Sequence, residues 1–461
     1  MSQLHTDDDR ALTEAGYKPQ LRRSLGFLAS FAVTFSAVSV LMGIYSNFGY
    51  VLGKAGPFGF WTWPLVGAGQ LLVALVFAEM AGRIPLTGAI YNWNVRLANP
   101  GIGWLCAWML FIAYCIGAVG VIVAMIAPLQ TFIGHELSAN ELRCVGVGII
   151  LLHALINIYG VHLASYTNKI AVIAEIIAVI VFGSVLLIAV LVNHEANTGL
   201  LAAVPSQPTP YWPAFMLATL MAAWTIIGFE LPSDLSEETV NVRRVAPKSI
   251  ISAVSISVVL GFLFLCILTF AIPDLAAVTA ATDPISAIVM AHLGGVMTKI
   301  FLVFVLIAMF ALALLVMAAA ARILFAVARD RRVFGASFLT KVSARKVPVA
   351  ATLLVTAIEI VTFLIAKDAV DLYAASTVLF FIAYLITVVN FTFGLKKLPP
   401  PEAFSLGRWR WPVIILATAW LIFEIGVLTI PTDFHNAAAI AGSVLVIGLP
   451  FYLIAKRRET A

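Results

Sequence analysis

Apolar residues are grouped along the chain into long continuous stretches that are separated by short polar loops. Each stretch has about 18 residues or more, the length that an α-helix needs to cross the hydrocarbon of a bilayer. A transmembrane β-barrel would show shorter segments of alternating polarity. The pattern therefore predicts an all-α integral membrane protein with twelve transmembrane helices. These lie near residues 26–53, 61–81, 103–133, 142–160, 168–192, 213–239, 248–272, 294–327, 348–366, 370–394, 411–431 and 436–455.

Composition agrees with this pattern. Of the 461 residues, 62% are hydrophobic and only 11% are charged, whereas soluble domains carry about 25% charged residues. Four cysteines in a chain of this length exclude a secreted scaffold held by disulfides. The sequence contains no zinc-protease, phosphate-loop or nucleophile-elbow motif and no metal-ligand spacing. We therefore expect no enzyme activity, no cofactor and no metal site.

The basic residues predict how the chain is oriented. With the N-terminus inside, 24 of the 28 Lys and Arg residues fall on the inner side, and the outer four are Lys54, Arg143, Lys299 and Lys367. This asymmetry across short loops is the positive-inside signal, so the net charge of +5 does not indicate a nucleic-acid partner. The polar first 25 residues lack the apolar core of a signal peptide. We expect a multi-pass protein of the cell (inner, cytoplasmic) membrane with both termini in the cytoplasm.

Two segments do not have the sequence of a plain helix. Residues 35–49 include Ser, Gly and Asn within an apolar stretch, and the sixth segment has Gly228, Glu230 and Pro232 close together. Gly and Pro weaken a helix, and an acid at membrane depth is costly unless it has a partner or a role. A Pro-kinked helix with a satisfied Glu would explain one such segment, but two of them favour a pair of broken helices, 1 and 6.

The two interrupted segments are five helices apart. Because an odd number of helices reverses the chain direction, residues 26–192 and 213–395 would form two inverted repeats. Interrupted helices at matching positions of such repeats indicate the midplane site of a secondary transporter. We expect a cytoplasmic N-terminal tail (1–25), a transporter core (26–395), and two trailing helices with the cytoplasmic C-terminus (396–461).

Three stretches carry a resemblance to a known family. They are GYKPQLRRSLGFLASFAVTFSAVSVLMGI (16–44), FAEMAGRIPLTGAIYNW (77–93) and GFELPSDLSEETVNVRRVAPKSI (228–250). Through them the chain resembles the amino acid–polyamine–organocation (APC) superfamily, and most closely its amino acid/choline transporter branch. The resemblance implies a five-plus-five inverted repeat with two trailing helices. It also implies transport of amino acids or small amines, often driven by protons.

The same resemblance implies a substrate site at the two breaks. The first helix would unwind near residues 40–43 and hold a substrate carboxylate on its backbone amides, while carbonyls near Ile227 and Gly228 would face an ammonium group. Similarity to the arginine/agmatine antiporter, through the Trp-x5-Glu spacing, places Trp224 at a gating Trp and Glu230 at a proton-sensing acid. The candidate substrate-binding residues are Val40, Leu41, Met42, Gly43, Ile44, Tyr45, Trp224, Ile227, Gly228, Phe229 and Glu230.

Two further side chains are candidates for coupling and gating. Glu175 lies in the fifth segment, where proton-coupled relatives often have a Lys. A carboxylate there could carry the proton together with Glu230, meet a cation, or pair with a basic side chain. Tyr114 is a second gating candidate beside Trp224, because an aromatic face suits an ammonium group, although packing explains most intramembrane aromatics. Glu79 and Arg83, four residues apart, are expected to form an ordinary ion pair.

These observations predict a secondary active transporter, a permease that imports an amino acid or small organic amine with coupling to protons. An exchanger of an amino acid for its amine product, and an amine sensor that resembles a transporter but carries no net flux, remain alternatives. The expected partners are the small-molecule substrate, protons and the lipid bilayer. A homodimer is left open.

Overall fold

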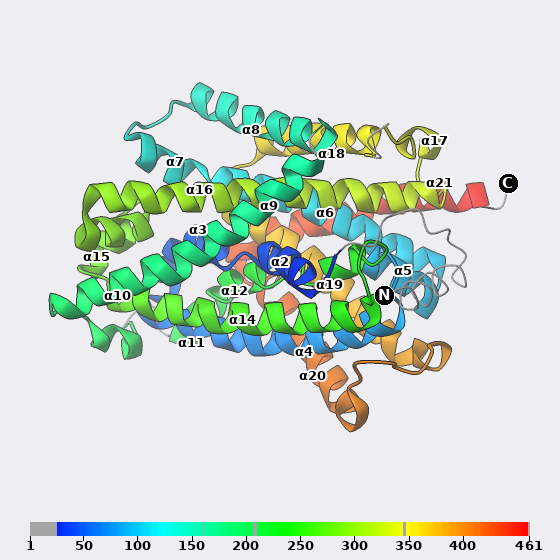
Figure 1. The fold of residues 1–461 in the computed structure, drawn as a ribbon, viewed down its shortest axis with the longest axis horizontal. Helices are drawn as coiled ribbons and strands as arrows, with labels where there is room; N and C mark the ends of the chain where they lie inside the picture. The colour runs from blue at the N-terminus through cyan, green and yellow to red at the C-terminus, as the bar shows by residue number, and fades with distance from the viewer. Residues whose placement is uncertain (1–24, 160, 206–209, 344–346, 460–461) are drawn as a thin grey trace.

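The computed structural model describes residues 25–159, 161–205, 210–343 and 347–459. These residues form an elongated bundle of helices (Figure 1). Within them, β pairing is limited to an isolated parallel bridge between Leu25 and Thr239. The all-helical prediction is therefore confirmed for the described part of the chain.

The elements follow one another along the chain as short and long helices. The first part contains α2 (Phe27–Val38), α3 (Val40–Ala55), η1 (Pro57–Trp61), α4 (Thr62–Arg83), α5 (Ala89–Leu97), α6 (Pro100–Ala124), α7 (Ile126–Ile133), α8 (Ala139–Tyr159), α9 (Val161–Ile176), the π-helical turn η2 (Ile177–Phe182), α10 (Gly183–Val192) and η3 (Thr198–Ala202). The second part contains α11 (Tyr211–Leu217), α12 (Leu220–Thr225), α13 (Leu231–Asp234), α14 (Val242–Phe270), α15 (Leu275–Ala280), α16 (Pro284–Arg329), α17 (Ala336–Leu339), α18 (Val349–Ile365), α19 (Ala369–Gly394), η4 (Leu395–Lys397), η5 (Gly407–Trp409), α20 (Arg410–Val427), η6 (Thr432–Phe434) and α21 (His435–Glu459).

Within the described residues, ten helical stretches are apolar and long enough to cross a membrane. An eleventh predicted segment corresponds to α18, which is apolar but has 17 residues. The sixth predicted segment is not one helix, because α11, α12 and α13 divide it into three pieces. Length and hydrophobicity alone thus locate every apolar segment, and the interruption expected from Gly228 and Glu230 falls where the backbone departs from helical geometry.

The long helix α16 begins ten residues before the predicted segment. Gly294 has non-helical φ and ψ angles of 76° and 173°, and the piece from Pro284 to the kink lies beside α15 at one end of the bundle (Figure 1). Asp283 caps this piece by accepting from the Ser286 amide at 3.2 Å. A capping acid followed by Pro at the first helical position is a helix-start signal, which the search for apolar runs passed over.

The centre of the bundle is formed by the broken segments and by the helices that pack on them. In this centre α3 packs on α12, α2 packs on α13, and α6 lies between α16 and α19. α8 and α20 lie towards the outside of the bundle (Figure 1) and expose large apolar side chains such as Leu155 and Ile415. This distribution is the one expected of a bundle whose outer helices face lipid.

Candidate functional site

The first break is a single residue, Ser39. Its φ of 39° is left-handed, so α2 ends and α3 begins there. Residues at the start of a helix have no intrahelical acceptor for their amides. The Leu41 amide donates instead to Glu175 Oε1 at 3.1 Å, and the Val40 amide and Ser39 side chain also face that carboxylate.

Glu175 comes from α9, 134 residues further along the chain, and its side chain is buried. The amides of a helix start and its positive dipole end favour an anion. The structure therefore brings Glu175 together with the stretch that was expected to hold a substrate carboxylate. In this conformation the Leu41 amide donates its hydrogen bond to a carboxylate of the protein itself, that of Glu175.

The second break extends from Ile226 to Glu230. α12 ends at Thr225, Ile226 leaves the helical region, and Gly228 takes a φ of +74° that a residue with a Cβ adopts only with strain. The Gly228 amide donates to the Tyr384 hydroxyl at 2.9 Å, and its carbonyl accepts from the Leu231 amide at 3.1 Å. Of the two carbonyls expected to face an ammonium group, that of Gly228 is thus engaged in a turn.

Glu230 is buried at the end of this break and is held by two tyrosines. Its Oε2 accepts from the Tyr384 hydroxyl at 2.5 Å, and its Oε1 accepts from the Tyr114 hydroxyl at 3.3 Å. Because Tyr384 accepts from the Gly228 amide while it donates to Glu230, its hydroxyl fixes the acid relative to the break. Hydrogen bonds linked in this way polarise one another.

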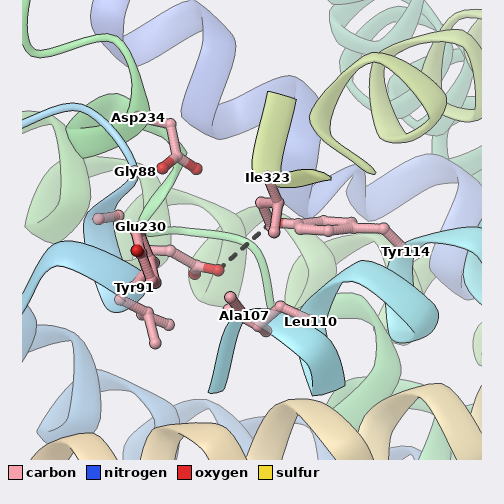
Figure 2. Close-up of a pocket in the computed structure, with 10 residues that line it drawn as sticks. Gly88, Tyr91, Ala107, Leu110, Tyr114, Glu230, Asp234 and Ile323 are labelled. Atoms are coloured by element: carbon pink, nitrogen blue, oxygen red, sulfur yellow. Dashed lines mark hydrogen bonds between the residues drawn. The ribbon is translucent and has the colours of Figure 1, made fainter. Parts of the chain in front are cut away.

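A narrow pocket opens beside Glu230. Figure 2 shows Tyr114 and Glu230 joined by their hydrogen bond, with Asp234 at the same cavity. Residues from α5, α6 and α16 complete the lining, and Asp234 lies close enough to Glu230 for the two acids to interact. The lining residues are Gly88, Ala89, Ile90, Tyr91, Ala107, Leu110, Tyr114, Glu230, Asp234 and Ile323.

The two breaks lie against each other. A Cβ on Gly43 would overlap the Thr225 side chain, and a Cβ on Gly228 would lie 3.7 Å from that of Ala37. Gly43 is therefore the residue that lets α3 approach the end of α12. In this conformation, the small size of Gly43 allows α3 and α12 to pack closely against each other.

The remaining candidates are dispersed around this centre. Trp224 stacks on Tyr373 with ring centroids 4.6 Å apart. Phe229 packs against Phe77 and Tyr384, which also contact each other. The Tyr45 hydroxyl contacts Asp283 and Ser286, at 2.5 and 2.8 Å, at the start of α16. The structure thus joins Tyr114 to Glu230 and Leu41 to Glu175. The side chains of Val40, Met42, Ile44 and Ile227 are buried in the core.

Sequence reasoning missed Tyr384, the residue that ties the second break to Glu230. Its signal was a phenol in the middle of an apolar segment, where a hydroxyl needs a partner. Asp283 was missed because it precedes the apolar run, although it caps α16. Among the described residues no group of three or more His, Cys, Asp or Glu side chains is placed to hold a metal ion.

Fold and site together define a class of protein. Two interrupted helices pack side by side within a bundle of membrane-length helices, and a buried carboxylate lies at each interruption. This is the arrangement in which secondary transporters place their binding sites.

The chain belongs to the amino acid permease family, whose sequence profile matches residues 25–450. It is 24% identical to Amino-acid permease BAT1 of Arabidopsis thaliana over 97% of this chain and 94% of that protein. It is 26% identical to the BAT1 homolog of Oryza sativa subsp. japonica (97% and 93%) and 23% identical to Amino-acid permease 2 of Neurospora crassa (96% and 87%). The resemblance stated from three sequence stretches is confirmed, and the protein is identified as a transporter rather than an enzyme.

Proposed function

We propose that this permease is a secondary active transporter that imports an amino acid or a small organic amine across the cytoplasmic membrane with proton coupling. One observation carries the proposal: each helix break is paired with a buried carboxylate, Glu175 on the Leu41 amide and Glu230 on two tyrosine hydroxyls. Buried acids at membrane depth that contact a broken helix are the groups whose protonation can bias one conformation over another.

The proposed topology has twelve crossings, with inverted repeats at 26–192 and 213–395, trailing helices at 396–461, and both termini in the cytoplasm. Side-chain contacts support this topology, because residues that it places on the same side of the membrane contact each other. On the outer side, Lys54 pairs with Asp433. On the inner side, Arg410 and Arg83 both bind Glu79, which strengthens the ion pair expected from spacing alone.

The proposed substrate site lies at the two breaks. A substrate carboxylate would bind the amides of residues 40–43, and an ammonium group would lie at the end of α12, attracted by Glu230 and covered by Trp224. Tyr114 would act as a second gate because its hydroxyl already contacts Glu230. The carboxylate of a bound substrate must compete with Glu175 for the Leu41 amide.

This competition offers a mechanism for coupling. When a substrate carboxylate takes the amide, Glu175 loses its hydrogen bond in an apolar interior. A buried ionised carboxylate without a partner is costly, and protonation removes that cost. Substrate binding would then draw a proton onto Glu175, and release of the substrate would let the acid return to the helix start.

Transport by the purified chain in liposomes tests the proposal. A thermal-shift screen of amino acids and amines first selects a ligand, since binding raises apparent stability. Uptake is then measured with an inward proton gradient, without one, and with substrate on both sides. Concentrative uptake that requires the gradient is expected. Flux that requires substrate on both sides would instead indicate an exchanger, and binding with no flux would indicate a sensor; either result overturns the proposal.

A further inference from the structure

A second cavity lies at the end of the bundle opposite α15. It is formed by the start of α6, the chain after α16 and the last turns of α21, and its volume is about 270 Å³. This size is just below the range of drug-sized ligand pockets, as suits a site for a headgroup. Its lining includes Asn99, Gly101, Trp104, Arg332, Tyr452 and Lys456.

The wall of this cavity is built from aromatic side chains that fix its shape. Trp104 donates from Nε1 to the Arg332 carbonyl at 2.8 Å, so α6 holds the Arg332 backbone in place. The Trp104 ring lies 5.5 Å from Tyr452 and stacks on Trp108, which also contacts Phe451. Indole and phenol rings that combine an apolar body with a polar edge gather at the membrane–water interface.

Two basic side chains, Arg332 and Lys456, line the cavity, and none of its described lining residues is acidic. An Arg guanidinium matches the geometry of a phosphate, and a Lys adds a mobile positive charge. Asn99 already accepts from the Gly101 and Ile102 amides, so the two cations, rather than the backbone of α6, would bind an anion.

The surface beside the cavity is apolar. On α21, next to Tyr452, Leu449, Phe451 and Leu453 expose 58%, 42% and 57% of their surface. A free phosphate would gain nothing from these side chains. A molecule with an anionic head and an acyl chain would satisfy both the cations and the apolar face, and basic pockets between helices at the cytoplasmic face suit anionic headgroups.

We propose that the cavity formed by α6, Arg332 and α21 binds the phosphate of an anionic phospholipid in the cytoplasmic leaflet. The guanidinium of Arg332 and the ammonium of Lys456 hold the phosphate, Trp104 and Tyr452 pack on the headgroup, and an acyl chain follows the exposed face of α21. The choice of leaflet rests on the proposed orientation of the protein, whereas the binding itself does not.

The test measures phosphatidylglycerol binding to the purified full chain by native mass spectrometry, with phosphatidylcholine as the neutral comparison. Wild type is expected to retain phosphatidylglycerol in preference to phosphatidylcholine. Each cation near an anionic lipid contributes to binding, so Lys456→Gln should weaken retention about fivefold and Arg332→Gln/Lys456→Gln about 25-fold. The matched control, Arg331→Gln/Lys341→Gln, removes the same charge from exposed positions of the same inner loop and should weaken retention less than about twofold.

Three results would overturn the site. Equal losses in the control would show a general surface attraction, and full competition by inorganic phosphate at millimolar concentration would show a free-anion site. Retention unchanged in Lys456→Gln, whose exposed side chain leaves the fold intact, would remove the site even if the double variant failed to fold. No substrate is present in these measurements, so failure of the lipid site is distinguishable from failure of the transport proposal.

Discussion

The two helix breaks face each other but are built differently. At the first, one left-handed residue, Ser39, separates two helices, and the acid that meets the break comes from α9. At the second, the helix is lost from Ile226 onwards, and the acid, Glu230, belongs to the break itself. Backbone amides hold Glu175, whereas tyrosine hydroxyls hold Glu230.

This difference assigns different properties to the two acids. A helix start can accept any carboxylate, so in the proposed mechanism Glu175 occupies a position for which a substrate carboxylate would compete directly. Glu230 is held by Tyr384 and Tyr114, which would remain in place when a substrate binds. In the proposed mechanism the first break therefore exchanges one anion for another, whereas the second keeps its acid in place near the end of α12. The predictions below test this division.

The largest effect is expected for Glu230→Gln. Glutamine keeps the shape but neither carries the proton nor attracts an ammonium group. Hydrogen bonds to a charged group contribute about 1.5–3 kcal/mol, so substrate affinity should fall about tenfold to hundredfold and gradient-driven uptake in liposomes should be abolished. Glu136→Gln, an exposed acid, is the control. Accumulation with an unchanged pH dependence would show that Glu230 is neither the coupling nor the amine-binding group.

Glu175→Gln should separate accumulation from exchange. The glutamine oxygen can still accept from the Leu41 amide, but the side chain binds no proton, so uptake against a gradient should be lost while counterflow stays within about threefold of wild type. Neutral acceptors bind about half as strongly as charged ones. At high pH, where Glu175 is ionised in wild type, a carboxylated substrate should therefore bind the variant more tightly than it binds wild type.

The sign of the pH effect follows from the same competition. As pH falls, a proton on Glu175 weakens its hold on the Leu41 amide, so wild type should bind a carboxylated substrate more tightly at low pH. Glu175→Gln should lack this dependence, and so should wild type with an amine that has no carboxylate. If binding of the amine and of the amino acid responds equally to pH, Glu175 does not compete with the substrate.

Trp224→Ala should affect every mode of transport alike. The indole stacks on Tyr373 and lies beside Gly117 of α6, so its removal would leave the proposed substrate site uncovered. Counterflow and accumulation should fall together, about tenfold to thirtyfold, if loss of the stack costs about 1.5–2 kcal/mol in binding. Trp224→Phe keeps an aromatic face and should recover most of the activity. Loss of accumulation with normal counterflow would give Trp224 a coupling role rather than a gating one.

Tyr384→Phe should produce a smaller loss at the second break. The change removes one hydroxyl, which leaves the Gly228 amide and one Glu230 oxygen without their present partner. A hydrogen bond to a charged group supports an effect of about tenfold on substrate affinity. Tyr211→Phe is the matched control, because its hydroxyl donates to the Ala55 carbonyl at 2.8 Å and makes no bond to Glu230. Equal losses in both variants would mean that Tyr384 does not act through the break.

Much of the fold was predictable because lipid imposes it. A chain that must satisfy its backbone in hydrocarbon shows its helices as apolar runs, and the segments so predicted overlap the observed helices. The breaks were also visible, because Gly228, Pro232 and the acid between them conflict with a helix. The partners of the two acids were not predictable. Glu175 meets Leu41 across 134 residues, and Tyr384 meets Glu230 across 154, and such contacts depend on how the helices pack.

The smallest effect is expected for Gly43→Ala, which tests the contact between the two breaks. A methyl group there would overlap the Thr225 side chain, whereas Gly53, on the same helix, has no neighbouring atom within 4 Å of the position of an added Cβ. Overpacking of a tight contact costs about 1–3 kcal/mol. Gly43→Ala should therefore lower the thermal stability of the purified protein without ligand, and Gly53→Ala should leave it unchanged or slightly raise it, since Ala favours helix. Because the overlap is between helices, the loss should appear in the ligand-free protein and not only in substrate affinity. A stable Gly43→Ala protein that binds no substrate would instead show that residue 43 faces the substrate, and that the breaks separate during transport.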